Sequence, residues 1–168
     1  MDLLGDQAVF HSYALAGKTA LICGASRGIG AATAQVMAKA GANVVVASRN
    51  GTQLKALLEQ LKTLGDGQHR MLIMDLEETE SIAASVEPLL VEGPIHILVN
   101  NAGGPPGGPL LKATVDELSQ PFARHLHAAH TLVKLLAPGM ESANYGRIIQ
   151  IVSTSVREPI PNLGVSNT

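Results

Sequence analysis

Residues 23–30 read Cys-Gly-Ala-Ser-Arg-Gly-Ile-Gly, and this segment sets the architecture that we expect of the whole chain. It stands between an apolar run of strand length, residues 19–23, and a helical pattern, and its glycines are spaced as GxxxGxG. Glycine here allows a tight turn, lets the backbone approach a diphosphate and lets the helix start close to the strand. A glycine triplet alone also fits an ordinary turn, so its place between strand and helix carries the argument. The free N–H groups at the start of such a helix predict an anion site.

Apolar runs of strand length alternate with longer helical patterns along the rest of the chain. Candidate strands cover residues 19–23, 43–47, 70–74, 95–100 and 147–152, and helices are expected over 29–40, 53–64, about 78–91 and about 114–137. Each strand is nearly continuous in apolar residues, which is typical of parallel strands covered on both faces. Thr114 and Glu117 form a capping-box pattern, and Pro121 is expected to break or kink the last helix. The predicted fold class is α/β, a Rossmann-type doubly wound parallel sheet.

Size and composition agree with one such domain, because 46% of the 168 residues are hydrophobic and 15% are charged. We assign residues 1–16 to an N-terminal extension and residues 17–168 to the dinucleotide-binding domain. The formal net charge is −2, and scattered basic residues give no electrostatic footprint for nucleic acid. No apolar stretch reaches the roughly 20 residues that cross a bilayer, and a single cysteine, Cys23, excludes an internal disulfide. We therefore expect a cytoplasmic protein with no membrane or nucleic-acid partner.

The end of the second candidate strand indicates which dinucleotide is bound. It reads Ala47-Ser48-Arg49-Asn50 and lacks the acidic residue that usually meets the ribose hydroxyls of NAD(H). Arg49 and Arg27 are placed to bind a 2′-phosphate through paired hydrogen bonds, so we expect NADP(H), with NAD(H) less favoured. The alternative is two solvated surface arginines. Asp75, after the third strand, either hydrogen-bonds an adenine edge or caps the next helix.

Several separate motifs together resemble the short-chain dehydrogenase/reductase family, particularly its 3-oxoacyl-acyl-carrier-protein reductase-like branch. They are Gly17-Lys18, the glycine loop, Asp75-Leu76, Asn100-Asn101-Ala102-Gly103 and the run GRIIQIVS at residues 146–153. The resemblance covers the chain from about residue 15 to its end. It implies an oxidoreductase that transfers hydride between a nicotinamide coenzyme and a small carbonyl or alcohol substrate.

The residues above and the resemblance together give an expected site. Its coenzyme-binding residues are Gly24, Ser26, Arg27, Gly28, Ile29, Gly30, Arg49, Asp75, Leu76, Asn101, Ala102 and Gly103. Ser153 is implied to hydrogen-bond the substrate carbonyl as negative charge develops on its oxygen; the alternative is a hydroxyl that satisfies backbone groups at a strand end. No metal is expected, because His125, His127 and His130 lack the HExxH pattern and a carboxylate partner close in sequence.

Two positions depart from the family pattern. Family members carry a tyrosine about 13 residues after the serine, and the residue there is Ser166, whose hydroxyl is a far weaker acid than a phenol. His125 stands where the family usually has an asparagine that holds a proton-relay water. This histidine either relays protons or is simply a polar residue on a helix. The family's lysine would follow beyond Thr168, so the domain is expected to be C-terminally truncated.

These departures leave two classes of function open. One is a working NADP(H)-dependent oxidoreductase, in which Ser166, His125, a water or a later residue supplies the proton. The other is a dinucleotide-binding sensor or scaffold without chemistry, or an inactive fragment of the enzyme. The family also implies a homodimer or homotetramer through the 114–137 helix, for which core packing is the alternative.

Overall fold

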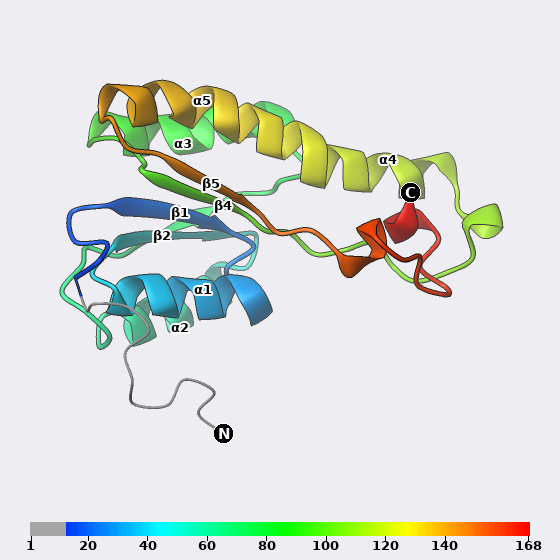
Figure 1. The fold of residues 1–168 in the computed structure, drawn as a ribbon, viewed down its shortest axis with the longest axis horizontal. Coiled ribbons are helices and arrows are strands. Elements are labelled where there is room, and N and C mark those ends of the chain that lie inside the picture. The colour runs from blue at the N-terminus through cyan, green and yellow to red at the C-terminus, as the bar shows by residue number, and fades with distance from the viewer. Residues whose placement is uncertain (1–12) are drawn as a thin grey trace.

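The computed structural model describes residues 13–168, so most of the expected extension at residues 1–16 lies outside the described residues. At its centre is a five-stranded sheet in the order β3-β2-β1-β4-β5 (Figure 1). The strands are β1 (Thr19–Cys23), β2 (Asn43–Ser48), β3 (Arg70–Ile73), β4 (Ile97–Asn100) and β5 (Arg147–Gln150). All four neighbouring pairs are parallel. The predicted Rossmann-type α/β fold is therefore confirmed.

Helices cover the two faces of this sheet in separate layers (Figure 1). The helices are α1 (Gly28–Lys39), α2 (Gly51–Leu61), α3 (Ile82–Val91), α4 (Val115–Pro121) and α5 (Ala128–Ser142). Short 3₁₀ turns are η1 (Thr79–Ser81), η2 (Leu110–Lys112), η4 (Thr154–Val156) and η5 (Val165–Asn167). Helices α1 and α2 lie on one face, and α3 and α5 lie on the other.

Alternate residues of the inner strands build two hydrophobic cores. On β1, Ala20 and Ile22 pack in the core under α1 and α2, whereas Leu21 and Cys23 pack in the core under α3 and α5. Each of these four side chains is at most 1% exposed. This arrangement explains why the inner strands are continuous in apolar residues: both faces of each strand are covered.

The expectation that all five strands are covered on both faces is wrong for the two edge strands. Met71 and Ile73 on β3 are 42% and 61% exposed, and Ile148 and Ile149 on β5 are 43% and 40% exposed. An edge strand has a neighbour on one side only, so fewer helices reach it. An apolar run in the sequence indicates a strand, but it does not indicate whether that strand lies at the edge or in the centre of the sheet.

Several element boundaries differ from the sequence prediction by a few residues. Helix α2 begins at Gly51 rather than at Gln53, because the side chain of Asn50 accepts a hydrogen bond from the Gln53 amide and caps the helix there. Strand β4 begins two residues later than predicted, and β5 ends two residues earlier. None of these shifts changes the order of the elements.

The long helix after β4 is interrupted at Pro121, as predicted. The capping box of Thr114 and Glu117 is present, also as predicted. The regular α-helix ends at Pro121, and the chain continues through a π-helical segment, η3 (Phe122–His127), into α5, which runs to Ser142 past Pro138. Proline has no N–H to donate, so the regular α-helical pattern is interrupted where η3 begins.

The order of the strands reverses between β1 and β4, which pair in the middle of the sheet. The loops after these two strands therefore leave the sheet on opposite faces, and a crevice opens at the carboxyl ends of the strands. In the described residues no helix is long and apolar enough to cross a membrane.

Candidate functional site

Two pockets meet at the carboxyl ends of the strands. The first, of about 550 Å³, lies over the glycine loop and the ends of β2 and β3. The second, of about 540 Å³, lies over the ends of β4 and β5 and beside η3. Both pockets are lined by Ile29, Leu76, Asn101, Ala102 and Arg124. These shared residues make the two pockets neighbouring halves of one elongated cleft.

The glycine loop presents an uncapped helix N-terminus to the first pocket. Arg27 occupies the N-cap position of α1 without a capping side-chain hydrogen bond, and the first turn contains no acidic residue. Gly28 has a φ of +59° and leaves open space where a side chain would stand. Free amides, a positive helix end and an open backbone are the features that hold a diphosphate.

Asn101 fixes this loop from the end of β4. Its Nδ2 donates hydrogen bonds to the carbonyl oxygens of Cys23 and Gly24, each at 3.2 Å. Gly30 lies behind the loop and lines neither pocket, because it packs against the Gly24 backbone and the Asn101 side chain. Asn101 therefore shapes the first pocket through the backbone of the glycine loop, in addition to lining it.

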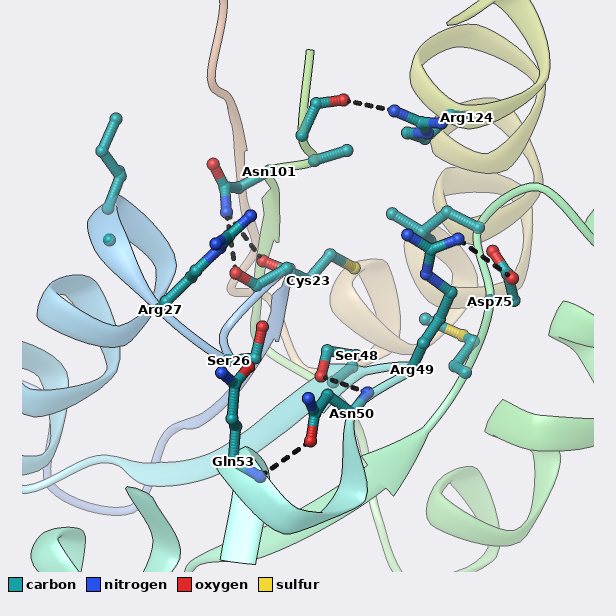
Figure 2. Close-up of a pocket in the computed structure, with 18 residues that line it drawn as sticks. Cys23, Ser26, Arg27, Ser48, Arg49, Asn50, Gln53, Asp75, Asn101 and Arg124 are labelled. Atoms are coloured by element: carbon teal, nitrogen blue, oxygen red, sulfur yellow. Dashed lines mark hydrogen bonds and ion pairs between the residues drawn. The ribbon is translucent and has the colours of Figure 1, made fainter. Parts of the chain in front are cut away.

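The two predicted phosphate-binding arginines both line the first pocket (Figure 2). In Figure 2, Arg27 and Arg49 reach into the cleft from different sides. The Arg49 Nη1 lies 3.6 Å from Asp75 Oδ2 and 3.7 Å from Glu77 Oε1, and its side chain is 65% exposed. These ion pairs are longer than hydrogen bonds, so they hold Arg49 only loosely.

Asp75 uses its carboxylate in a turn rather than as a helix cap. Its Oδ1 accepts a hydrogen bond from the Glu77 amide at 3.0 Å, and the following 3₁₀ turn begins at Thr79. The alternative that Asp75 caps the next helix is therefore wrong. Its other oxygen faces Arg49 at the rim of the first pocket.

Arg124 links three segments at the junction of the two pockets. It comes from η3, and its Nε and Nη2 donate to Glu77 Oε1, the former at 2.9 Å. Its Nη1 donates to the carbonyl of Gly103 at 2.7 Å, as the dashed line in Figure 2 shows. The ring Nε2 of His125 lies 3.2 Å from the same carbonyl.

The second pocket brings together the three residues predicted to act in catalysis. Ser153, Ser166 and His125 all line it. The Ser153 Oγ accepts hydrogen bonds from the Ser155 amide at 3.1 Å and from the Ser155 hydroxyl at 2.8 Å. Ser153 thus satisfies a backbone amide at the start of η4, which is the alternative stated for it above. It also lines the second pocket. The Ser155 hydroxyl also lies 3.4 Å from the carbonyl oxygen of Ser166, a second acceptor for its single hydrogen.

His125 is held in its neutral form. A carbonyl only accepts, so the contact with Gly103 requires a hydrogen on Nε2 of His125 and leaves Nδ1 as an acceptor. Desolvation by burial lowers the pKa of His125 and the positive charge of Arg124 lowers it further, against the opposing effect of the hydrogen bond to Gly103. The imidazole is therefore mostly uncharged near neutral pH.

Three residues of the site, Glu77, Arg124 and Ser155, were not predicted from the sequence. Arg124 and Glu77 are 47 residues apart, and no local pattern predicts that pair. Ser155, which is 5% exposed, supports Ser153 from two residues away; the short run Ser-Thr-Ser was the signal available for it. Among the residues that the structure describes, no group of three or more His, Cys, Asp or Glu side chains could hold a metal ion.

Curated relatives match most of this chain. The family model described as short chain dehydrogenase matches residues 18–165. Ketoacyl reductase HetN of Nostoc sp. is 35% identical over 147 residues, which are 87% of this chain and 51% of HetN. The 3-oxoacyl-[acyl-carrier-protein] reductase FabG of Pseudomonas aeruginosa is 35% identical over 154 residues, which are 91% of this chain and 61% of FabG.

Solved structures share the fold. L-Sorbose reductase from Gluconobacter frateurii, complexed with NADPH and L-sorbose, has a TM-score of 0.87 at 30% identity, covering 94% of this chain and 60% of that one. The 3-oxoacyl (acyl-carrier-protein) reductase from Agrobacterium tumefaciens with NADP bound has a TM-score of 0.85 at 28% identity, covering 98% and 64%. The chain spans about half to three-fifths of the length of its first curated relatives. By the extent of the family match and by its fold, the chain belongs to the short-chain dehydrogenase family, as its motifs predicted.

Proposed function

We propose that this chain binds NADP(H) along the cleft and acts as an oxidoreductase on a carbonyl or hydroxyl substrate held in the second pocket. The observation that carries the proposal is the uncapped, acid-free start of α1, with Gly28 open in front of it and Arg27 and Arg49 on the rim. This arrangement suits a diphosphate and an additional phosphate monoester.

A preference for NADP(H) over NAD(H) rests on Arg49. Its contacts with Asp75 and Glu77 are loose enough to be exchanged for a 2′-phosphate, which offers a guanidinium stronger, paired hydrogen bonds. Solved relatives support this preference, because L-sorbose reductase, the Agrobacterium reductase and a metagenomic short-chain oxidoreductase were each solved with NADPH or NADP.

In the proposed reaction the nicotinamide coenzyme supplies or accepts the hydride. Ser153 donates its hydroxyl hydrogen to the substrate oxygen, where negative charge develops during reduction, and the contacts with Ser155 position the Ser153 oxygen. A proton must also reach this oxygen. Ser166, His125, a water or a residue outside this chain supplies it in the proposed enzyme.

A second function is favoured by Ser166 itself, which stands where the family carries its tyrosine acid. A serine hydroxyl is a poor proton donor near neutral pH. The alternative is therefore a protein that binds the coenzyme without turning it over, as a sensor of redox state or a scaffold.

Coenzyme titration tests the first part of the proposal. Following NADPH and NADH binding by calorimetry, we expect NADPH to bind more tightly, and Arg49→Ala to weaken NADPH binding by about tenfold or more while changing NADH binding less. Arg70→Ala is the matched control, because Arg70, at the start of β3, pairs with Glu92 and lines neither pocket. Equal affinities of the wild type for both coenzymes would contradict the NADP(H) assignment.

Turnover tests the second part. Reduction of 3-oxoacyl thioesters and simple ketones by NADPH should be lost in Ser153→Ala, and an unchanged rate in that variant would refute the role of Ser153. Coenzyme binding without turnover of any ketone, followed by activity in Ser166→Tyr, would instead favour the second function.

We also propose that the chain forms a homodimer or homotetramer through the helix of residues 114–137. Val115, Phe122 and Leu126 are 77%, 51% and 57% exposed along this helix. Exposed large apolar side chains on one element suit a contact with a second copy. Light scattering of the wild type and of Leu126→Glu tests this; a monomeric wild type at micromolar concentration contradicts it.

A further inference from the structure

Arg124 occupies the narrow boundary between the two pockets and lines both of them. Its side chain is 18% exposed, far less than the 65% of Arg49. All three of its guanidinium nitrogens donate to protein acceptors, two of them to the Glu77 carboxylate and one to the Gly103 carbonyl. An arginine so nearly buried and so fully paired is fixed in position.

These contacts join segments that are distant in the sequence. Glu77 lies in the loop after β3, Gly103 in the loop after β4 and Arg124 in η3, at separations of 47 and 21 residues from the arginine. The loop after β3 borders the first pocket, and the loop after β4 runs between the first pocket and the second. The contacts of Arg124 therefore join the loop after β3 to the loop after β4 beside the junction of the two halves of the cleft.

Glu77 has two arginine neighbours, and its contact with Arg124 is stronger than its contact with Arg49. Its Oε1 makes hydrogen bonds with Arg124 but lies 3.7 Å from Arg49, too far for one. Losing Arg49 to a ligand phosphate would leave Glu77 still neutralised by Arg124. Arg49 can therefore exchange its contact with Glu77 for a ligand phosphate, whereas Arg124 keeps its hydrogen bonds to Glu77.

Resting on the NADP(H) binding proposed above, we propose that Arg124 and Glu77 form a strut that holds the Gly103 carbonyl and with it the part of the cleft that receives the nicotinamide-ribose half of the coenzyme. The adenosine 2′-phosphate half lies by Arg49 in the first pocket and does not need the strut. Arg124 and Glu77 are positioning residues: they act through Gly103 and through the neighbouring His125, which contacts the same carbonyl.

Two ligands separate this role from a general effect on folding. Adenosine 2′,5′-bisphosphate carries only the adenosine half with its 2′-phosphate, whereas NADPH carries both halves. In Arg124→Met, which keeps an unbranched stem but removes the guanidinium group and its charge, we expect NADPH affinity to fall about tenfold, since charged hydrogen bonds are lost. Affinity for adenosine 2′,5′-bisphosphate should fall by a smaller factor, because this ligand lacks the nicotinamide-ribose half and is affected only through the contact between Glu77 and Arg49. Arg70→Met is the control, because it removes a different ion pair, with Glu92, outside both pockets.

The fluorescence of bound NADPH gives a second readout at the nicotinamide ring. At saturation, Arg124→Met should lose the emission change that the wild type produces on binding, and Arg70→Met should keep it. Arg124→Lys retains the charge but cannot span Glu77 and Gly103 with one rigid fork, so we expect it to restore NADPH affinity only in part.

A double-mutant cycle tests whether Glu77 acts through Arg124. Because Glu77 also neighbours Arg49, each variant is compared by its ratio of NADPH affinity to adenosine 2′,5′-bisphosphate affinity. The ratio should fall in Glu77→Gln and fall no further when Arg124→Met is added. Equal losses for both ligands, or an unchanged ratio in Arg124→Met, would overturn the strut while leaving NADP(H) binding intact. A wild type that binds neither ligand would instead overturn the proposed function, and the strut with it.

Discussion

Gly30 lies behind the glycine loop of residues 23–30, and the loop can pack closely there because glycine has no side chain. A Cβ built at this position would collide with the Gly24 carbonyl oxygen and would stand 2.8 Å from Asn101 Nδ2. Both are parts of the contact by which the end of β4 supports the loop. Gly30→Ala should therefore displace the loop and destabilise the protein by about 1–3 kcal/mol, despite the better helix propensity of alanine.

Chemical denaturation and NADPH titration of the same variant check this expectation. Gly108→Ala is the matched control, because a Cβ there meets nothing within 4 Å and Gly108 lines neither half of the cleft. A Gly30→Ala protein with wild-type stability and wild-type coenzyme affinity would show that the loop can relax freely.

The thiol of Cys23 gives a second prediction at the scale of one residue. Cys23 is 1% exposed at the end of β1, and burial raises the pKa of its thiol to about 12. The thiolate is the reactive form, so the native protein should resist a thiol reagent such as DTNB near neutral pH. Labelling should proceed at the rate of unfolding and become fast in denaturant; rapid stoichiometric labelling of the native protein would contradict this burial.

At the scale of elements, the π-helical segment decides where Arg124 and His125 lie. Both contact the Gly103 carbonyl, although consecutive residues of a regular α-helix point about 100° apart. Pro121 immediately precedes the segment and cannot donate a backbone hydrogen bond. Pro121→Ala restores that donor and should favour regular α-helix, which would rotate α4 relative to α5.

We expect Pro121→Ala to keep or raise thermal stability while weakening NADPH binding several-fold, since helix propensity improves and the contacts at Gly103 are lost. Differential scanning fluorimetry and calorimetric titration measure the two effects. Pro138→Ala, which changes a proline of α5 distant from both pockets, is the control. Reduced stability with unchanged NADPH affinity would mean that Pro121 has only a packing role.

The same element shows the limit of the sequence prediction. Capping by Thr114 and Glu117 is a local pattern and was predicted correctly. The end of the regular α-helix at Pro121 followed from a second local rule, because proline is unfavourable inside an α-helix. The π-helical continuation and the contacts of Arg124 with Glu77 and Gly103 were not predicted, because those contacts join residues distant in the sequence.

For the whole molecule, the sheet could be predicted because its inner strands are coded by continuous apolar runs and its first turn by a glycine pattern. The exposure of β3 and β5 could not, because strand order depends on which runs pair in three dimensions. In the site, the positions that line the cleft followed from motifs. The contacts among Arg49, Asp75, Glu77 and Arg124 did not, because charged side chains choose partners by distance in space.

The stability of the whole molecule should fall on mild acidification, and two histidines supply the reason. His96 Nδ1 accepts from the Thr19 amide at 3.1 Å, and His69 Nδ1 accepts from the Val44 amide at 3.3 Å. Burial is the main cause that lowers the pKa of each below the usual 6.5, as it does for His125. Protonation would place a hydrogen on each Nδ1 and turn these acceptors into donors that face amides.

Because the folded-state pKa values are lowered, the unfolded chain binds more protons than the native one just below pH 6.5. The free energy of unfolding should therefore be greatest above pH 6.5 and decrease as the pH falls through 6.5 towards the lowered values. Urea unfolding at pH 7.5, 6.5 and 5.5, chosen to span the usual histidine pKa, measures this decrease. In the double variant His69→Asn and His96→Asn, an amide oxygen can accept both hydrogen bonds without titrating, so the decrease should be smaller. A wild type whose unfolding midpoint is the same at all three pH values would show that these histidines keep ordinary pKa values in the folded protein.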